Sequence, residues 1–158
     1  MIKRYKYIYF SILTFLWIFF IFNNSSLNAQ QSTNESNIIT IVAIKFFAMF
    51  TNYDKILLEK SIAVLVRKSA HFISYYILLL FIFSAIKYID INKRYIIVLS
   101  IVFCIMIAAF DEFIQLFSIG RSGNIIDVLI DTCGGLSAQA TIGIFCNSIH
   151  KNKIKCLT

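Results

Sequence analysis

The chain has 158 residues, of which 59% are hydrophobic and only 15% are charged. Soluble domains carry about a quarter charged residues, so the composition excludes an ordinary water-soluble domain and predicts an integral membrane protein. The formal net charge is +7, but the basic residues form short clusters beside apolar runs, which is typical of membrane proteins and argues against nucleic acid as a partner.

The first predicted element is the uncharged run Tyr7–Phe22, which follows three basic residues. Cleaved signal peptides and retained membrane anchors both begin in this way. Cleavage after Ala29 would place Leu27 at the −3 position, where a small residue is wanted. We therefore predict that residues 1–22 are a retained transmembrane anchor.

Residues 23–68 are predicted to form an extracytoplasmic loop that contains an amphipathic segment. Asn23–Asn37 is polar, which is typical of a solvated loop. Ile38–Phe50 is apolar but interrupted by Lys45, and at about 1.5 Å per residue it is too short to cross a hydrocarbon core of about 30 Å. It is predicted to be an interfacial or a re-entrant helix. Lys55–Lys68 mixes charges with Ile, Leu and Val, which indicates an amphipathic approach to the membrane.

Three further spans are predicted within residues 69–149. The first is the uncharged run Ser69–Ile86. The second, Tyr95–Phe110, is shorter than the roughly 20 residues that a crossing helix needs, so we expect it to continue through two acidic residues to about Phe117. The third is Ile125–Ile149. The predicted fold class is an all-α integral membrane protein, a bundle of about four transmembrane helices with an outer amphipathic segment.

The basic residues at the ends of the spans predict the orientation. Three lie before the first span, three in the turn Lys87–Arg94, and three in a basic tail, residues 150–158. Because short cytoplasmic segments are enriched in Lys and Arg, we predict that both termini are cytoplasmic and that the protein crosses the cell membrane. Membrane lipids are then its first partners.

This topology places the polar residues of three spans near the outer membrane face. Within each span they recur at spacings of i, i+4 or i, i+3, so that they share one face of the helix. On the last span this stripe continues as Gly134 and Ala138, small residues that let helices approach closely. Ionisable groups near hydrocarbon are costly and mark candidate functional sites. The candidate polar site consists of Arg67, Lys68, His71, Asp111, Glu112, Gln115, Arg121, Asp127 and Asp131.

Four short motifs resemble the signatures RKxxHF, DExxQ, GRxG and DxxxDxxG of the VanZ-like family, in matching order and spacing. They are Val66–Phe72, Asp111–Phe117, Gly120–Gly123 and Asp127–Gly134. The resemblance covers roughly Arg67 to Gly143. It implies a small bacterial membrane protein of the cell envelope, in a family whose namesake is associated with resistance to the glycopeptide antibiotic teicoplanin.

One departure from the family pattern concerns His71. The family often has a glutamate three residues after this histidine, where the chain has Ser74. The carboxylate that the resemblance would place beside His71 is therefore expected to be absent, and with it any proton relay between those two positions.

Three interpretations of the candidate polar site stay open. In the structural one, the cations Arg67, Lys68 and Arg121 neutralise the carboxylates and fix helix register, because buried charges need partners. In the binding one, which we favour, the same cations contact an anionic headgroup or carboxylate of a lipid-linked or glycopeptide-type ligand. In the third, paired carboxylates perform general acid–base chemistry. No catalytic residue is identified, because spacing points to no nucleophile.

No cofactor and no metal ion are predicted. The candidate polar site contains a single histidine, and the nearest cysteine, Cys133, lies one turn deeper on its helix. Transition-metal sites usually gather several His or Cys side chains. The four cysteines of the chain include no CxxC pair, so neither a zinc motif nor a disulfide framework is predicted.

Overall fold

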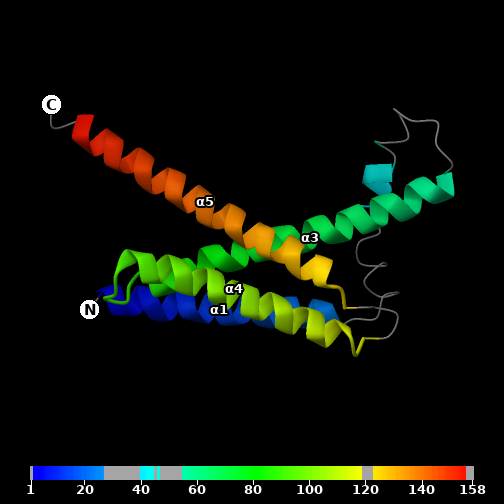
Figure 1. Cartoon of the computed structure of the whole chain (residues 1–158), viewed down its shortest axis with the longest axis horizontal. Coiled ribbons are helices and arrows are strands. Elements are labelled where there is room, and N and C mark those ends of the chain that lie inside the picture. Colours follow the sequence, from blue (N-terminus) through cyan, green and yellow to red (C-terminus); the bar gives the residue numbers. More distant parts are fainter. Residues whose placement is uncertain (1, 27–39, 45, 47–54, 119–122, 156–158) are drawn as a thin grey trace.

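The computed structural model describes residues 2–26, 40–44, 46, 55–118 and 123–155. Within these ranges the chain forms helices and short connections, and no residue there is in a β-strand. The long helices of Figure 1 are α1 (Ile2–Ser26), α3 (Lys55–Ile86), α4 (Lys93–Gln115) and α5 (Ile125–Lys155). Residues 40–44 and 46 are also helical.

The four long helices are each apolar and long enough, within the described ranges, to cross a membrane. Their candidate spans are Lys3–Ser26, Lys60–Ile86, Lys93–Gln115 and Ile125–Cys146. Large apolar side chains such as Phe15, Phe113 and Ile144 are exposed on the outer surface, where lipid tails suit them and water does not. The prediction of an all-α membrane bundle of about four spans is therefore confirmed.

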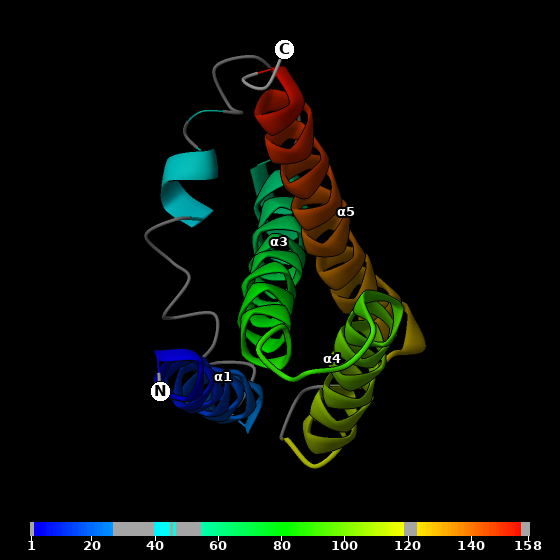
Figure 2. The same ribbon diagram turned by 90° about the vertical axis from the view of Figure 1, so that its left-hand side faces the viewer.

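α3 and α4 each pack against the other three helices, and α3 has the more extensive contacts of the two. α1 and α4 lie beside each other, while α5 crosses α3 obliquely and also contacts α4 (Figures 1 and 2). The core in which the helices meet consists of Ile21 of α1, Tyr75, Leu78, Leu79 and Ile82 of α3, Cys104 and Ala108 of α4, and Ala138 of α5.

Small residues bring α5 against α3. A Cβ atom on Gly134 would collide with the backbone carbonyl of Phe72 in α3, so the two backbones approach as closely as small residues allow in membrane helix pairs. The predicted inward stripe of α5 is confirmed for Asp131, Gly134 and Ala138, which are buried. Asp127, one turn before Asp131 in that stripe, is half-buried.

Three helices extend beyond the predicted spans. α3 begins at Lys55, so the predicted amphipathic segment and the second span form one unbroken helix. α1 reaches Ser26, inside the predicted polar loop, and α5 reaches Lys155, inside the predicted tail. The chain has no proline and its first glycine is Gly120, so α1 and α3 meet no helix-breaking residue. Charged and polar residues end a membrane span, but they do not end a helix.

Much of the predicted extracytoplasmic loop lies outside the described residues. This holds for most of Asn23–Asn37 and for part of Ile38–Phe50. The interfacial or re-entrant position of that second segment stays a prediction.

The helices alternate in direction, so each end of the bundle gathers particular helix ends. At one end the rings of Phe10 in α1 and Tyr88 in the α3–α4 turn stack with centroids 6.3 Å apart. At the other end the Ser118 hydroxyl donates a 3.0 Å hydrogen bond to the carbonyl of Ser25 in α1. We call this second end, where α1 and α4 end and α5 begins, the polar end.

Candidate functional site

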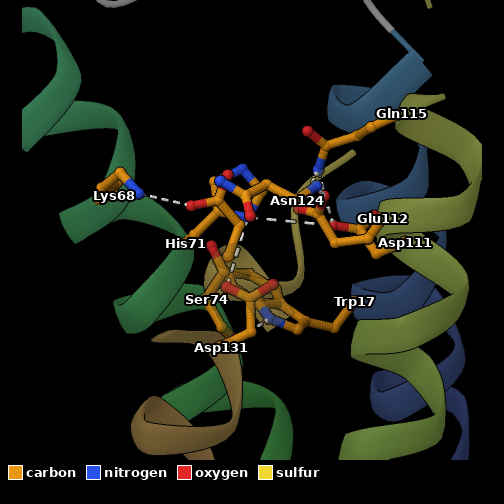
Figure 3. A network of polar contacts seen from close by, with 10 residues as sticks. Trp17, Lys68, His71, Ser74, Asp111, Glu112, Gln115, Asn124 and Asp131 are labelled. Carbon is orange, nitrogen blue, oxygen red and sulfur yellow. Dashed lines mark hydrogen bonds and ion pairs between the residues drawn. The ribbon is translucent and has the colours of Figure 1, made fainter. Parts of the chain in front are cut away.

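The structure brings the predicted polar residues of three helices together at the polar end (Figure 3). Lys68 and His71 come from α3, and α4 and α5 contribute the carboxylates and the amide that face them. Arg67 is exposed at the edge of this group of residues, and we call that edge the rim. Arg121, the remaining predicted member, lies outside the described residues. The described members of the set are Arg67, Lys68, His71, Asp111, Glu112, Gln115, Asp127 and Asp131.

An ion pair joins α3 to α5 at the edge of the polar end. The Lys68 ammonium lies 2.6 Å from Oδ1 of Asp127 and donates a hydrogen bond to it. Their side chains are 32% and 18% exposed, so water screens the pair in part and its net contribution to stability is modest. Helical spacing predicted that these residues would share a membrane face, but it did not predict their pairing.

His71 faces two carboxylates that belong to two other helices. Its Nδ1 lies 3.5 Å from Oδ1 of Asp131 in α5 and 3.9 Å from Oδ2 of Asp111 in α4. Both aspartate side chains are fully buried, while the histidine side chain is 21% exposed. Ser74 supplies no carboxylate to His71, as the sequence predicts. Helix packing supplies two carboxylates from distant parts of the chain in place of a neighbour on α3.

Glu112 ties the end of α4 to the beginning of α5. One carboxylate oxygen accepts a 3.1 Å hydrogen bond from the Gln115 amide, and the other accepts a 2.8 Å bond from the backbone N–H of Asn124. The Asn124 side chain in turn accepts from the N–H of Ile126, in the first turn of α5. An anion at a helix N-terminus is favourable because unpaired N–H groups and the positive end of the dipole lie there. Glu112 therefore has a clear structural role.

Several buried oxygen atoms of this region accept no hydrogen bond from the described residues. They are both carboxylate oxygens of Asp131, Oδ1 of Asp111 and the hydroxyl of Tyr75. Buried polar groups are nearly always paired, and exceptions call for an explanation such as a water, an ion or a catalytic role. Sequence reasoning missed Tyr75, although it lies four residues after His71 and so on the same face of α3.

A small cavity of about 10 Å³ lies between His71 and Asp131 on its inner side and Arg67 and Lys68 towards the rim. That volume is at the lower limit of about 10–15 Å³ that one water molecule needs. The cavity therefore has room for a single water-sized particle and none for a substrate. A larger ligand would contact the rim.

Ser74 itself has a packing role on the α1 side of α3. Its backbone carbonyl accepts a 3.0 Å hydrogen bond from the indole N–H of Trp17 in α1. This bond fixes α1 to α3 within a turn of His71 (Figure 3).

Comparison with known proteins gives one match. A family model described as VanZ/LLP1 matches residues 10–146, which include all of α3 and α4, most of α1 and α5, and all the candidate site residues. The resemblance predicted from the four motifs is confirmed by this match. Neither a curated protein nor a solved structure matches the chain.

Proposed function

Because the chain belongs to the VanZ/LLP1 family and four of its described helices can cross a membrane, we propose that it is a cell-envelope protein that binds an anionic envelope molecule at its polar end. In this proposal the polar end faces outward from the cytoplasmic membrane and both termini are cytoplasmic. The bound group is a phosphate or carboxylate of a lipid-linked or glycopeptide-type ligand. Binding lowers the sensitivity of the cell to teicoplanin-type antibiotics.

The observation that carries the proposal is the position of Arg67. It is exposed at the rim of the polar end, next to Lys68, and the ion pairs of the described residues do not include it. A guanidinium group offers a planar fork of N–H donors that matches a carboxylate or phosphate in two-point contact. Lys68 is already bound to Asp127, so of the two described cations at the rim Arg67 is the one that is available to an external anion.

The other polar residues would support this contact. Asp127 holds Lys68 at the rim through the 2.6 Å ion pair, which keeps a second positive charge beside Arg67. Gln115 and His71, which border the small cavity, would supply neutral hydrogen bonds to a ligand. Arg121 belongs to the same proposal by its position in the sequence, between α4 and α5.

The test compares two basic residues of α3 in a teicoplanin-sensitive bacterium that expresses the chain. Arg67→Gln removes the rim cation, and Lys60→Gln removes an exposed cation about two turns earlier on the same helix. We expect Arg67→Gln to abolish the protection that the unaltered chain gives, at unchanged abundance in the membrane, and Lys60→Gln to retain it. Survival on teicoplanin and the amount of folded protein are measured in the same cells.

Two outcomes would overturn the proposal. If protection follows abundance in every variant, the candidate polar site is scaffolding and the protein acts as a structural partner of another membrane protein. If the unaltered chain gives no protection, its role differs from the one that the family name suggests.

A second candidate function rests on His71 between two carboxylates. This arrangement suits general acid–base chemistry on a lipid-linked substrate. It predicts turnover of such a substrate by the purified protein that His71→Gln abolishes, while Arg67→Gln weakens substrate binding. Absence of turnover with a panel of lipid-linked envelope precursors would remove this candidate.

A further inference from the structure

Three potential metal ligands converge at the polar end from three different helices. They are Nδ1 or Nε2 of His71 in α3 and one carboxylate oxygen each of Asp111 in α4 and Asp131 in α5, all within 4.8 Å of one another. Ligands at about 2.1 Å from a tetrahedral Zn²⁺ lie about 3.4 Å from each other. The His71–Asp131 distance of 3.5 Å already matches this value, and the His71–Asp111 distance of 3.9 Å needs a shift of only a few tenths of an ångström.

The two carboxylates are buried with few donors, since only Oδ2 of Asp111 accepts a hydrogen bond from the described residues, and the Gln115 amide donates to it at 3.4 Å. Asp111 and Asp131 have no exposed surface, and three of their four oxygens accept no hydrogen bond from the described residues. The cost of burying an ionised carboxylate is large unless it is paired or coordinates a metal. A cation between these oxygens and the imidazole would supply the missing partner.

The neighbouring charges of the described residues leave this requirement unmet. The Lys68 ammonium is bound to Asp127 at 2.6 Å, and the Glu112 carboxylate receives only neutral N–H donors. A neutral imidazole with two carboxylates carries a charge of −2, which a divalent cation cancels. The small cavity beside His71 and Asp131 has room for one water-sized particle.

We propose that His71, Asp111 and Asp131 form a binding site for a divalent transition-metal ion, with Zn²⁺ as the preferred ion. One imidazole nitrogen and two carboxylate oxygens suit Zn²⁺ or Mn²⁺, whereas Mg²⁺ and Ca²⁺ favour oxygen ligands alone and Cu⁺ favours sulfur. Three protein ligands leave one coordination position open, and the cavity lies on the side towards Arg67 and Lys68. The ion holds α3, α4 and α5 together and offers that position to a water or an anion. This cation site does not depend on the anion-binding role proposed for Arg67.

The experiment uses the full chain in lipid nanodiscs, stripped of metal with a chelator and then titrated with Zn²⁺. Elemental analysis should find one Zn²⁺ per chain, and the thermal unfolding temperature should rise with the free Zn²⁺ concentration, because an ion that binds only the folded state stabilises it. His71→Gln, Asp111→Asn and Asp131→Asn should each weaken binding by at least about tenfold.

Two matched controls test whether the loss is specific. Asp127→Asn removes a carboxylate one turn earlier on α5, and His150→Gln removes the only other histidine of the chain. Both should retain the ion. Equal loss in Asp127→Asn would mean that negative charge in general attracts Zn²⁺, and this result would overturn the proposal, as would retention of the ion by His71→Gln.

A further measurement tests whether His71 binds the metal ion even if the variants of the three ligands do not fold. In the His150→Gln chain, His71 is the only imidazole, and all three proposed ligands are intact. Mn²⁺ added to this chain should lose the spectrum of the free aqueous ion and show a coupling to an imidazole nitrogen by pulsed electron paramagnetic resonance. Absence of bound Mn²⁺ and Zn²⁺, or a bound Mn²⁺ without nitrogen coupling, would overturn the proposal.

Discussion

The two ends of the bundle place charged side chains in opposite surroundings. In the turn between α3 and α4, the charged residues of 87–94 are all exposed, as is normal for charges at a membrane edge. At the polar end Asp111, Glu112 and Asp131 are buried. His71 of α3 lies beside both aspartates, and the Gln115 amide and the backbone N–H of Asn124 donate to Glu112. Burial of a charge is costly unless partners compensate it. The difference teaches that the polar end is built to hold charge away from water, whereas the opposite end only marks where the membrane stops.

The largest effect is expected from reporter fusions that show on which side of the membrane each end of the bundle lies, because each fusion is either active or inactive. A reporter fused after Gly123 samples the polar end, and fusions after Lys93 and after Lys155 sample the basic segments. Because Lys and Arg favour the cytoplasm, we expect the Gly123 fusion to be active only with an extracytoplasmic reporter and the other two only with a cytoplasmic one. A cytoplasmic signal at Gly123 would contradict the proposal of an outward-facing binding site.

The next largest effect is expected from the ion pair between Lys68 and Asp127. Lys68→Gln leaves a carboxylate only 18% exposed without its cation, and we expect it to lower the free energy of unfolding by about 1–3 kcal/mol. The matched change at the opposite end, Lys93→Gln, removes an exposed lysine and should stay within about 0.5 kcal/mol of the unaltered chain. Both free energies are measured on purified protein by denaturant titration in mixed micelles.

The exchange of the two charges sharpens this result. The double variant Lys68→Asp with Asp127→Lys keeps one charge of each sign on facing helices. We expect it to recover at least half of the stability that Lys68→Gln loses, because an ion pair depends on opposite signs and not on which helix carries each. If the double variant is less stable than Lys68→Gln, then interactions other than the ion pair fix the position of Lys68.

The sequence predicted which residues gather at the polar end because two kinds of information can be read directly from it. Helical spacing shows which polar residues share a face, and the alternation of spans shows which faces meet at one membrane surface. The sequence did not predict which residues pair with each other between helices. The partner of Asp127 is Lys68, and the carboxylates beside His71 come from Asp111 and Asp131. These distances depend on how closely helices pack, which Gly134 decides for α3 and α5.

Helix ends were the other feature that the sequence did not define. The charges of Lys55–Lys68 suggested a segment separate from the span, but α3 is continuous through them. A helix continues into water when no glycine or proline stops it, so the membrane boundary and the helix boundary need not coincide. Tyr75 was missed for a related reason. An aromatic residue in an apolar run resembles a lipid-facing one, and only packing reveals that this side chain is buried.

The smallest effect in this series is expected from Glu112→Gln, which tests whether that residue serves structure or function. The glutamine keeps one acceptor oxygen, but its NH₂ group must face either the Gln115 amide or the N–H of Asn124, both of which are donors. One hydrogen bond between α4 and α5 is therefore lost, at a cost of about 1 kcal/mol. Asn124 is exposed, so water can replace the lost acceptor there and keep the cost low. The control, Asp90→Asn in the exposed α3–α4 turn, should stay within about 0.5 kcal/mol.

The sign of the stability change in Glu112→Gln shows which of two effects dominates at the polar end, the hydrogen bonds of Glu112 or the repulsion between its carboxylate and its acidic neighbours. Glu112 lies near Asp111 and Asp131, so removal of its charge also relieves repulsion between like charges. We expect the lost hydrogen bond to outweigh that relief, because both Glu112 oxygens have donors and its carboxylate lies at the favourable N-terminus of α5. The same denaturant titration gives the answer. A variant more stable than the unaltered chain would show that repulsion dominates, and that the polar end keeps its carboxylates at the expense of stability, as functional sites do.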